Sequence, residues 1–304
     1  MSYVAVEAPI ERASRTKPAT NEMLSIVVLT YNEQQNLPAC LSSLTPLQAS
    51  VFIVDSGSSD GTQQIAEQFG ATVTTHPFRT HTAQWSWALR NLPLNTPWVL
   101  ALDADQQATP ELVNELRNLD SPSFSNVSGA FVARRQIFRG RWIRHGGYYP
   151  KYLLKLFRPQ KVRLNPADLV DHHFAVDGPT IRLEGDIIEA NVKEDDMSFW
   201  IAKHNRYASL LAREELEWQR TGQRPSIGDL FKNNPDDRVA VLKSIWRRMP
   251  LYIRPFLYFF HRYFIRLGFL DGKQGAIFHF MQAFWFRLLV DIKLDDLRRD
   301  RDPI

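Results

Sequence analysis

The sequence has a single cysteine, Cys40, in a chain of 304 residues. One cysteine cannot form an internal disulfide, and a cysteine-based zinc site needs several thiolates, so both devices are excluded. The low cysteine use fits a reducing compartment such as the cytoplasm. Residues 1–22 contain no apolar run of the kind that a secretory signal requires, and we expect them to form a flexible tail.

Long hydrophobic runs are also missing. No segment has the roughly 18 consecutive apolar residues that a transmembrane helix needs, and in the C-terminal region the longest uncharged run, residues 274–286, is too short to span a bilayer. The chain does have 44% hydrophobic and 12% aromatic residues, which is typical of a globular protein. Its length allows one large domain, or a core domain with a smaller appendage.

Buried strands alternate with helices in the first half of the chain. The segments 24–31 (LSIVVLTY), 51–55 (VFIVD) and 98–103 (WVLALD) are apolar, as strands covered on both faces are. Residues 37–44, 62–68 and 109–119 between and after them have helical spacing or helix-start residues. This alternation predicts an α/β fold, with a mostly parallel sheet flanked by helices on both faces. From about residue 196 the chain is predicted to be helical.

Polar clusters follow three of the predicted strands: TYNE at 30–33, DSGSSDGT at 55–62 and DAD at 103–105. In open α/β sheets, ligands bind outside the carboxyl ends of the strands. We therefore expect the three clusters to line one site.

The two aspartates of the third cluster, Asp103 and Asp105, have the chemistry of a metal site. Mg²⁺ and Mn²⁺ prefer oxygen ligands, and Mg²⁺ in phosphate chemistry uses one or two carboxylates with waters and the phosphates of the substrate. The alternative is an ordinary solvated strand end that happens to be acidic. The position downstream of two other polar strand ends favours the metal.

The second cluster is open to more than one interpretation. Asp55 directly follows a buried strand, and small residues with Gly57 and Gly61 permit a tight turn or close approach to a ligand. An ordinary polar turn has the same composition. A phosphatase-type motif is set aside because Ser58 stands where its first aspartate should be, and no Gly-Lys-Ser/Thr follows to make a Walker loop.

Together the segments 25–37 (SIVVLTYNEQQNL), 51–62 (VFIVDSGSSDGT), 84–91 (QWSWALRN) and 101–105 (ALDAD) resemble family 2 glycosyltransferases, which have the nucleotide-sugar-binding GT-A fold. The resemblance implies a UDP-sugar or similar donor, with Mg²⁺ or Mn²⁺ held by Asp103 and Asp105 as a DxD motif. It implies that the nucleotide pocket is lined by Thr30, Tyr31, Asn32, Glu33 and Asp55. Gln84, Arg90 and Asn91 match donor-site positions more loosely.

The later segments 146–159, 203–215 and 268–275 (GFLDGKQG) resemble the lipopolysaccharide-core β-glucosyltransferase-like branch of this family. That branch implies a lipid-linked or cell-envelope glycan acceptor. We expect a catalytic domain over 23–195 and a helical C-terminal region over 196–304.

An inverting transferase needs a general base for the acceptor hydroxyl. The related branch carries a His-Glu pair near LVDHHFAVDG (169–178), where this chain has Asp171 and His172. Either is a candidate base, and His173 is a candidate metal or phosphate ligand. The more distant candidates are Glu189, Asp195 and Asp196. A polar loop with incidental histidines is the alternative.

Two other functions stay open. The altered base motif allows a domain that binds a nucleotide sugar without transferring it. A sugar nucleotidyltransferase would also use an α/β sheet and metal-binding aspartates, but it should carry a Gly-rich basic loop after its first strand, where this chain has the acidic TYNEQQNL.

The C-terminal region carries the basic charge of the chain. Residues 246–290 contain seven Arg or Lys and one Asp, whereas the whole chain has a net charge of only +4. Basic, aromatic helices can lie in a bilayer interface, so we expect peripheral association with an anionic membrane on its cytoplasmic face. The alternative is a helical subdomain packed on the catalytic core. No motif that stacks on bases or reads a groove is present, so nucleic acid is not an expected partner.

Overall fold

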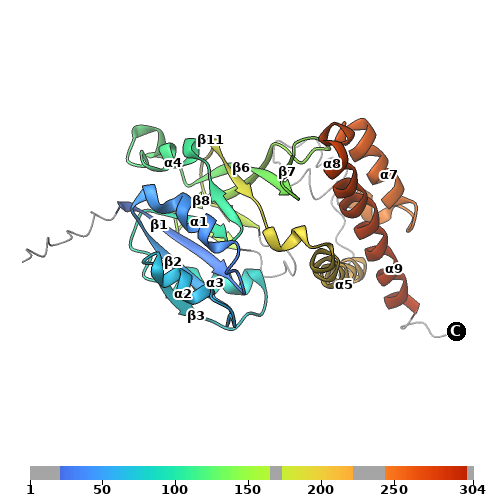
Figure 1. Cartoon of the computed structure of the whole chain (residues 1–304), viewed down its shortest axis with the longest axis horizontal. Coiled ribbons are helices and arrows are strands. Elements are labelled where there is room, and N and C mark those ends of the chain that lie inside the picture. Colours follow the sequence, from blue (N-terminus) through green and yellow to red (C-terminus); the bar gives the residue numbers. More distant parts are fainter. Residues whose placement is uncertain (1–20, 165–172, 222–243, 300–304) are drawn as a thin grey trace, which may run out of the picture.

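The computed structural model describes residues 21–164, 173–221 and 244–299. A nine-stranded sheet with flanking helices forms one part of the molecule, and the C-terminal helices α7 to α9 lie beside it along the long axis (Figure 1). The main order of strands across the sheet is β3-β2-β1-β4-β8-β6-β11-β5, with β7 paired to β6.

The N-terminal strands form the parallel half of the sheet. They are β1 (Asn21–Thr30), β2 (Ala49–Asp55), β3 (Thr72–Thr75) and β4 (Trp98–Asp103). All three pairings among them are parallel. Side chains alternate between the two faces of a strand, and both sets are apolar in β1 because both faces are covered.

Two clusters of buried side chains mark the two faces. On one face, Ile26 and Val28 pack with apolar residues of α1 (Leu37–Leu44), α2 (Thr62–Gln68) and α4 (Pro110–Leu116). On the other face, Val27 and Leu29 pack with Trp85 and Ala88 of α3 (His81–Asn91). The expected strand–helix alternation and the helices on both faces are thereby confirmed.

The rest of the sheet is mixed. It contains β5 (Gln106–Ala108), β6 (Gly129–Phe138), β7 (Arg141–Ile143), β8 (Lys151–Phe157) and β11 (Thr180–Glu189). β8 runs antiparallel to both β4 and β6, whereas β11 runs parallel to β6. A separate antiparallel pair, β9 (Val162–Leu164) and β10 (Phe174–Val176), packs on the face that carries α3. The α/β prediction is correct, and the parallel character belongs to the half that carries the polar clusters.

Local signals in the sequence begin and end the helices as expected. Thr109 caps α4 by accepting a hydrogen bond from the Leu112 amide at 3.3 Å, and Pro110 follows it at the first helical position. Gly70 follows α2 with a positive φ of 77°, which glycine adopts without strain. Short 3₁₀ turns η1 (Thr45–Leu47) and η2 (Pro122–Phe124) join neighbouring elements.

The described part of the C-terminal region, residues 196–221 and 244–299, is mostly helical, as expected. The turn η3 (Val192–Asp195) leads into the long helix α5 (Met197–Thr221). The later elements are α7 (Arg254–Phe260), the π-helical turn η5 (His261–Ile265), the 3₁₀ turn η6 (Gly268–Asp271), α8 (Gly272–His279), the π-helical turn η7 (Phe280–Trp285) and α9 (Phe286–Arg299). Among the described residues, no helix is long and apolar enough to cross a membrane.

A buried ion network fastens these helices together. The Arg254 guanidinium is fully buried and donates to Glu215 of α5 at 2.7 Å and to Asp291 of α9 at 2.5 Å. Beside it, Ala208 and Ala212 of α5 pack among apolar residues of α9. The small alanines allow the two helices to approach closely, and the network sets their register.

Candidate functional site

Strand register brings the three polar clusters to one edge of the sheet. Thr30 at the end of β1 pairs with Asp55 at the end of β2, and Leu29 pairs with Asp103 at the end of β4. Parallel strands end at the same edge, so the loops that follow β1, β2 and β4 meet there. This is the edge at which open α/β sheets bind ligands.

The loops after β1 and β2 are locked to each other by hydrogen bonds. Asn32 has a positive φ of 52°. Its backbone N–H donates to Ser58 Oγ at 2.8 Å, and its side-chain Oδ1 accepts a hydrogen bond from the backbone N–H of Ser59 at 2.8 Å. The Glu33 amide donates to Thr62 Oγ1 at 2.7 Å. The two loops therefore act as one wall of the site, from which the Tyr31 side chain projects with 58% exposure.

Asp55 organises this wall. Its buried carboxylate accepts hydrogen bonds from Thr30 Oγ1 at 2.8 Å, the Ser58 amide at 2.8 Å and Gln63 Nε2 at 2.7 Å. Burial alone would raise the pKa of Asp55, but the hydrogen bonds from Ser58 and Gln63 outweigh it and lower the pKa. Asp55 is thus a fixed anion whose oxygens already have protein partners.

The DAD cluster forms a second wall, at the end of β4 and next to the end of β1. Asp103 Oδ2 lies 3.1 Å from Nζ of Lys155, a buried residue of β8. The buried Gln106 side chain accepts the Asp103 amide at 3.1 Å and donates to Glu189 Oε2 at 2.9 Å. Glu189 also forms an ion pair with Arg134 at 3.0 Å. Gln106 thus joins the end of β4 to the end of β11.

Negative charge is crowded at this wall. Burial, followed by the charges of Glu189 and Asp103, raises the pKa of Asp105 to about 8. Burial would also raise the pKa of Glu189, but the Arg134 charge and the Gln106 hydrogen bond lower it. Glu189 is therefore ionised at neutral pH, and Asp105 resists ionisation beside it.

These residues fit a divalent cation that arrives with a phosphate-bearing ligand. Among the described residues, no three His, Cys, Asp or Glu side chains converge as a complete metal cage. A cation held by one or two carboxylates, waters and a diphosphate needs no such cage. Burial and the charges of Glu189 and Asp103 raise the pKa of Asp105, and a cation bound there would favour the ionised carboxylate.

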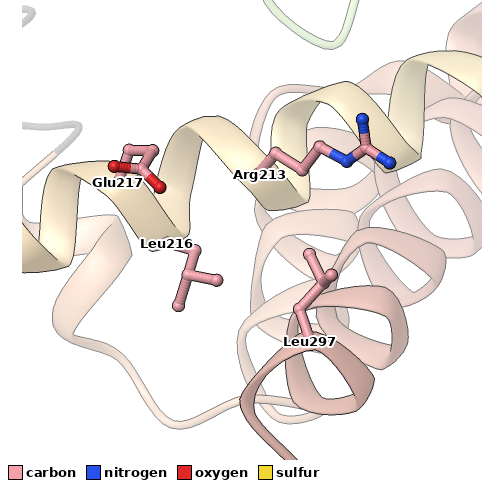
Figure 2. A pocket seen from close by; sticks show the side chains of 4 residues that line it. All are labelled: Arg213, Leu216, Glu217 and Leu297. Atoms are coloured by element: carbon pink, nitrogen blue, oxygen red, sulfur yellow. The ribbon is translucent and has the colours of Figure 1, made fainter. Parts of the chain in front are cut away.

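A hollow lies away from this edge, between α5 and α9. It measures about 420 Å³ and is lined by Arg213, Leu216 and Glu217 of α5 with Leu297 of α9 (Figure 2). Leu216 and Leu297 project into it from the two helices. None of the expected donor-site residues lines it, so it has no part in the site described above.

Comparison with known proteins decides the family. The family model described as glycosyl transferase family 2 matches residues 25–178, just over half of the chain, and this range includes all three polar clusters. The chain belongs to glycosyl transferase family 2. The α/β sheet and the loops of this family 2 glycosyltransferase agree with the fold expected from the resemblance.

Similar proteins extend over most of this glycosyltransferase. It is 26% identical over 278 residues to the lipopolysaccharide core biosynthesis glycosyltransferase LpsC of Rhizobium meliloti (strain 1021), covering 86% of this chain and 90% of the relative. It resembles the S. aureus TarS 1–349 structure at 12% identity, with a TM-score of 0.41 and 93% of each chain covered. A glucosyl-3-phosphoglycerate synthase from Mycobacterium tuberculosis, in complex with Mn²⁺ and uridine diphosphate, matches 38% of this chain and 44% of its own at 20% identity, with a TM-score of 0.31.

The expected donor-site residues of the glycosyltransferase fall into two groups. Gln84 is buried beside the loop that follows β2, where its side chain contacts His76 Nδ1 at 2.8 Å and donates to Ser56 Oγ at 3.2 Å. It therefore supports the conformation of that loop. Arg90 and Asn91 lie in the last turn of α3, which runs back toward the amino edge of the sheet, and each donates to a carbonyl of its own helix. The structure does not bring Arg90 and Asn91 to the candidate site.

The two candidate bases of the glycosyltransferase, Asp171 and His172, lie outside the described residues, so both stay predictions. His173 is exposed just before β10. Asp195 and Asp196 are exposed near η3, and Asp196 accepts the Ser198 amide at the start of α5. The remaining candidate, Glu189, does reach the site.

Four cations that form ion pairs in or near the candidate site were missed in the sequence. Lys155 and Arg134 reach Asp103 and Glu189 from β8 and β6, Lys193 reaches Glu33 at 2.6 Å, and Lys203 reaches Glu194 at 2.5 Å. Lys155 had a readable signal, since a lysine inside the apolar strand KYLLKLF must find a buried anion. Lys193 and Lys203 had none, because their partners are set by tertiary packing.

Proposed function

We propose that this family 2 glycosyltransferase moves a sugar from a nucleotide diphosphate donor, a UDP-sugar, to a lipid-linked or cell-envelope glycan. The observation that carries the proposal is the single edge of the sheet at which β1, β2 and β4 end, because the loops after β1 and β2 and the segment with Asp103 and Asp105 all begin there. The name of the LpsC relative, a lipopolysaccharide core enzyme, supports an envelope acceptor.

In the proposed donor site, one wall contacts the nucleoside and the other wall binds the metal ion and the diphosphate. Asp55 and Asn32 keep the loop wall rigid, and the exposed Tyr31 ring offers a surface for the nucleoside. Asp103 and Asp105 would hold Mg²⁺ or Mn²⁺, which stabilises the negative charge that develops on the departing diphosphate. Lys155 holds Asp103 in place, and Gln106 fixes the wall to Glu189.

The proposed reaction is a single displacement with inversion to a β-linkage. The acceptor hydroxyl oxygen forms a bond to the anomeric carbon, the bond from that carbon to the diphosphate breaks, and the hydroxyl proton passes to a base. We assign the base to Asp171 or His172. Glu189 is less suited to accept the proton because both of its oxygens already contact Arg134, and Arg134 and Gln106 lower its pKa.

We further propose that the enzyme works as a peripheral protein on the cytoplasmic face of a membrane, where lipid-linked acceptors are found. The concentration of basic charge in residues 246–290 supports this location.

A donor screen tests the proposed function. Thermal unfolding is measured with a panel of nucleotide sugars in the presence of Mn²⁺, and the true donor should raise Tm in proportion to RT ln(1 + [L]/Kd). Product analysis then separates the alternatives. Release of a nucleoside diphosphate means sugar transfer, release of pyrophosphate means nucleotidyl transfer, and a Tm shift without either product means binding alone.

A further inference from the structure

One helix of the C-terminal region places its apolar side chains on the outside. The large exposed side chains of α7 and its flanks are Ile253, Phe256, Leu257, Phe260 and Phe264, with exposures from 47% to 58%. Their spacing of three or four residues describes one face of a helix. The opposite side of α7 is buried at Arg254 and Pro255. A surface helix in water normally has the reverse arrangement, so this face is suited to an apolar environment.

The same surface continues beyond α7. Ile265, Leu267, Phe269 and Leu270 are 43% to 62% exposed, and Phe280 of η7 is 47% exposed. The Phe280 ring lies 6.2 Å from the ring of Phe259, which joins η7 to α7. We refer to the exposed apolar side chains of residues 253–270, together with Phe280, as the apolar face. A contiguous patch of this kind marks an interaction site on a folded protein.

The exposed charge within the segment that carries the apolar face is of one sign. Arg248, Arg266 and Lys273 are exposed around it. Within residues 244–290, all of which the structure describes, the only acidic side chain is Asp271, and it is buried. Two copies of the chain meeting through this face would bring like charges together, which is unfavourable. A lipid bilayer with anionic headgroups above an apolar layer matches both the apolar face and the cations beside it.

We infer that the apolar face inserts into the interfacial layer of an anionic lipid bilayer, with Arg248, Arg266 and Lys273 contacting the headgroups. Interfacial helices bind by this combination of buried aromatic and aliphatic side chains with cations at headgroup level. The inference deepens the proposed function and rests on it for one point, the membrane location of the acceptor.

The apolar face is fixed rigidly to the catalytic sheet. The loop after β7 is seated on the C-terminal region, where the Asp271 carboxylate accepts the His145 amide at 2.9 Å and contacts His145 Nδ1 at 2.7 Å. The Gly146 amide donates to the Arg266 carbonyl at 2.8 Å. Figure 1 shows α8 beside β7. Insertion of the face therefore also sets the orientation of the donor edge relative to the bilayer.

Vesicle binding tests the inference with the full chain. Wild-type protein should cosediment with phosphatidylcholine vesicles that contain phosphatidylglycerol, and high salt or pure phosphatidylcholine should weaken the binding. The variant F256S/F260S/I265S should lose at least about tenfold in partitioning. The charge variant R248E/K273E should lose about fivefold for each cation removed. The matched control F69S/I201S changes two exposed apolar residues outside the face and should bind like wild type.

The outcomes separate this inference from the proposed function. Equal vesicle binding by F256S/F260S/I265S and wild type overturns the inference, as does a wild-type protein that binds no anionic vesicles. A variant that instead turns a dimer into a monomer without changing vesicle binding assigns the face to a second copy. Nucleoside diphosphate release without vesicles should be unchanged in both face variants. Vesicle binding without any such release leaves the docking face intact and refutes the proposed function.

Discussion

The replacement D105N has opposite effects on stability and on activity. In the folded protein the pKa of Asp105 is raised from 3.8 to about 8. The unfolded chain therefore loses this proton near pH 4, whereas the folded chain keeps it until about pH 8. Between these values the folded state binds more protons, so Asp105 makes the free energy of unfolding fall as pH rises.

The magnitude follows from the size of the shift. About four pKa units at 1.36 kcal/mol each set an upper limit of about 6 kcal/mol. Asp105 is only half-buried, so solvent screens part of this energy, and we expect about 1–3 kcal/mol. An asparagine carries no charge at any pH, so D105N should be more stable than wild type by this amount at pH 8, and the difference should vanish only below about pH 4, where Asp105 is protonated in both the folded and the unfolded state.

Urea unfolding of metal-free wild type and D105N between about pH 3.5 and pH 9 provides the assay. Other groups with shifted pKa values, such as His279, titrate in both proteins, so the difference between the two curves isolates residue 105. Mg²⁺ with a nucleoside diphosphate should stabilise wild type more at pH 8 than at pH 5 and should have little effect on D105N. A D105N protein less stable than wild type at pH 8 would refute the electrostatic reasoning.

Three further predictions follow from the contacts. K155M should lower the free energy of unfolding by about 2–4 kcal/mol, because it removes the buried partner of Asp103, and K161M at an exposed turn should not; equal urea midpoints would contradict this. G146A should lower Tm well below that of G140A. Both sites have a positive φ, but a Cβ at Gly146 would lie 2.0 Å from His279, whereas a Cβ at Gly140 meets nothing within 4 Å. Equal Tm values would show that the backbone strain of a positive φ, and not the clash with His279, determines the loss of stability. R254M should cost about 3–5 kcal/mol in urea unfolding, because it leaves Glu215 and Asp291 buried and unpaired; a loss no larger than that of the exposed-site control R220M would contradict the buried network.

The parallel half of the fold could be predicted from the sequence because its signals are local. Continuous apolar runs identify β1, β2 and β4, and Thr109 with Pro110 identifies the start of α4. Since parallel strands end at one edge, the meeting of Thr30, Asp55 and Asp103 followed without further information. The mixed half could not be placed in this way, because the insertion of β8 between β4 and β6 depends on pairing between distant segments.

The candidate site was predictable in position but not in detail. Asp55 is expected to line the nucleotide pocket, which stays a prediction, but the sequence did not reveal that its oxygens also hold the loops together. Arg90 was assigned by its place in a motif, but the direction of α3 carries it away from the edge. The hydrogen bond from Gln106 to Glu189 joins residues 83 positions apart, and no local sequence pattern predicts such a contact.

The most direct test of the account is the metal dependence of product release at the edge formed by the loops after β1, β2 and β4. Purified wild-type protein is incubated with each UDP-sugar, with Mn²⁺ or with a chelator, and the nucleoside diphosphate is quantified beside D103A and D105A. We expect release to require Mn²⁺ and each variant to lose about 100-fold or more in rate. Release that persists undiminished in D105A, or pyrophosphate as the product, would contradict this expectation.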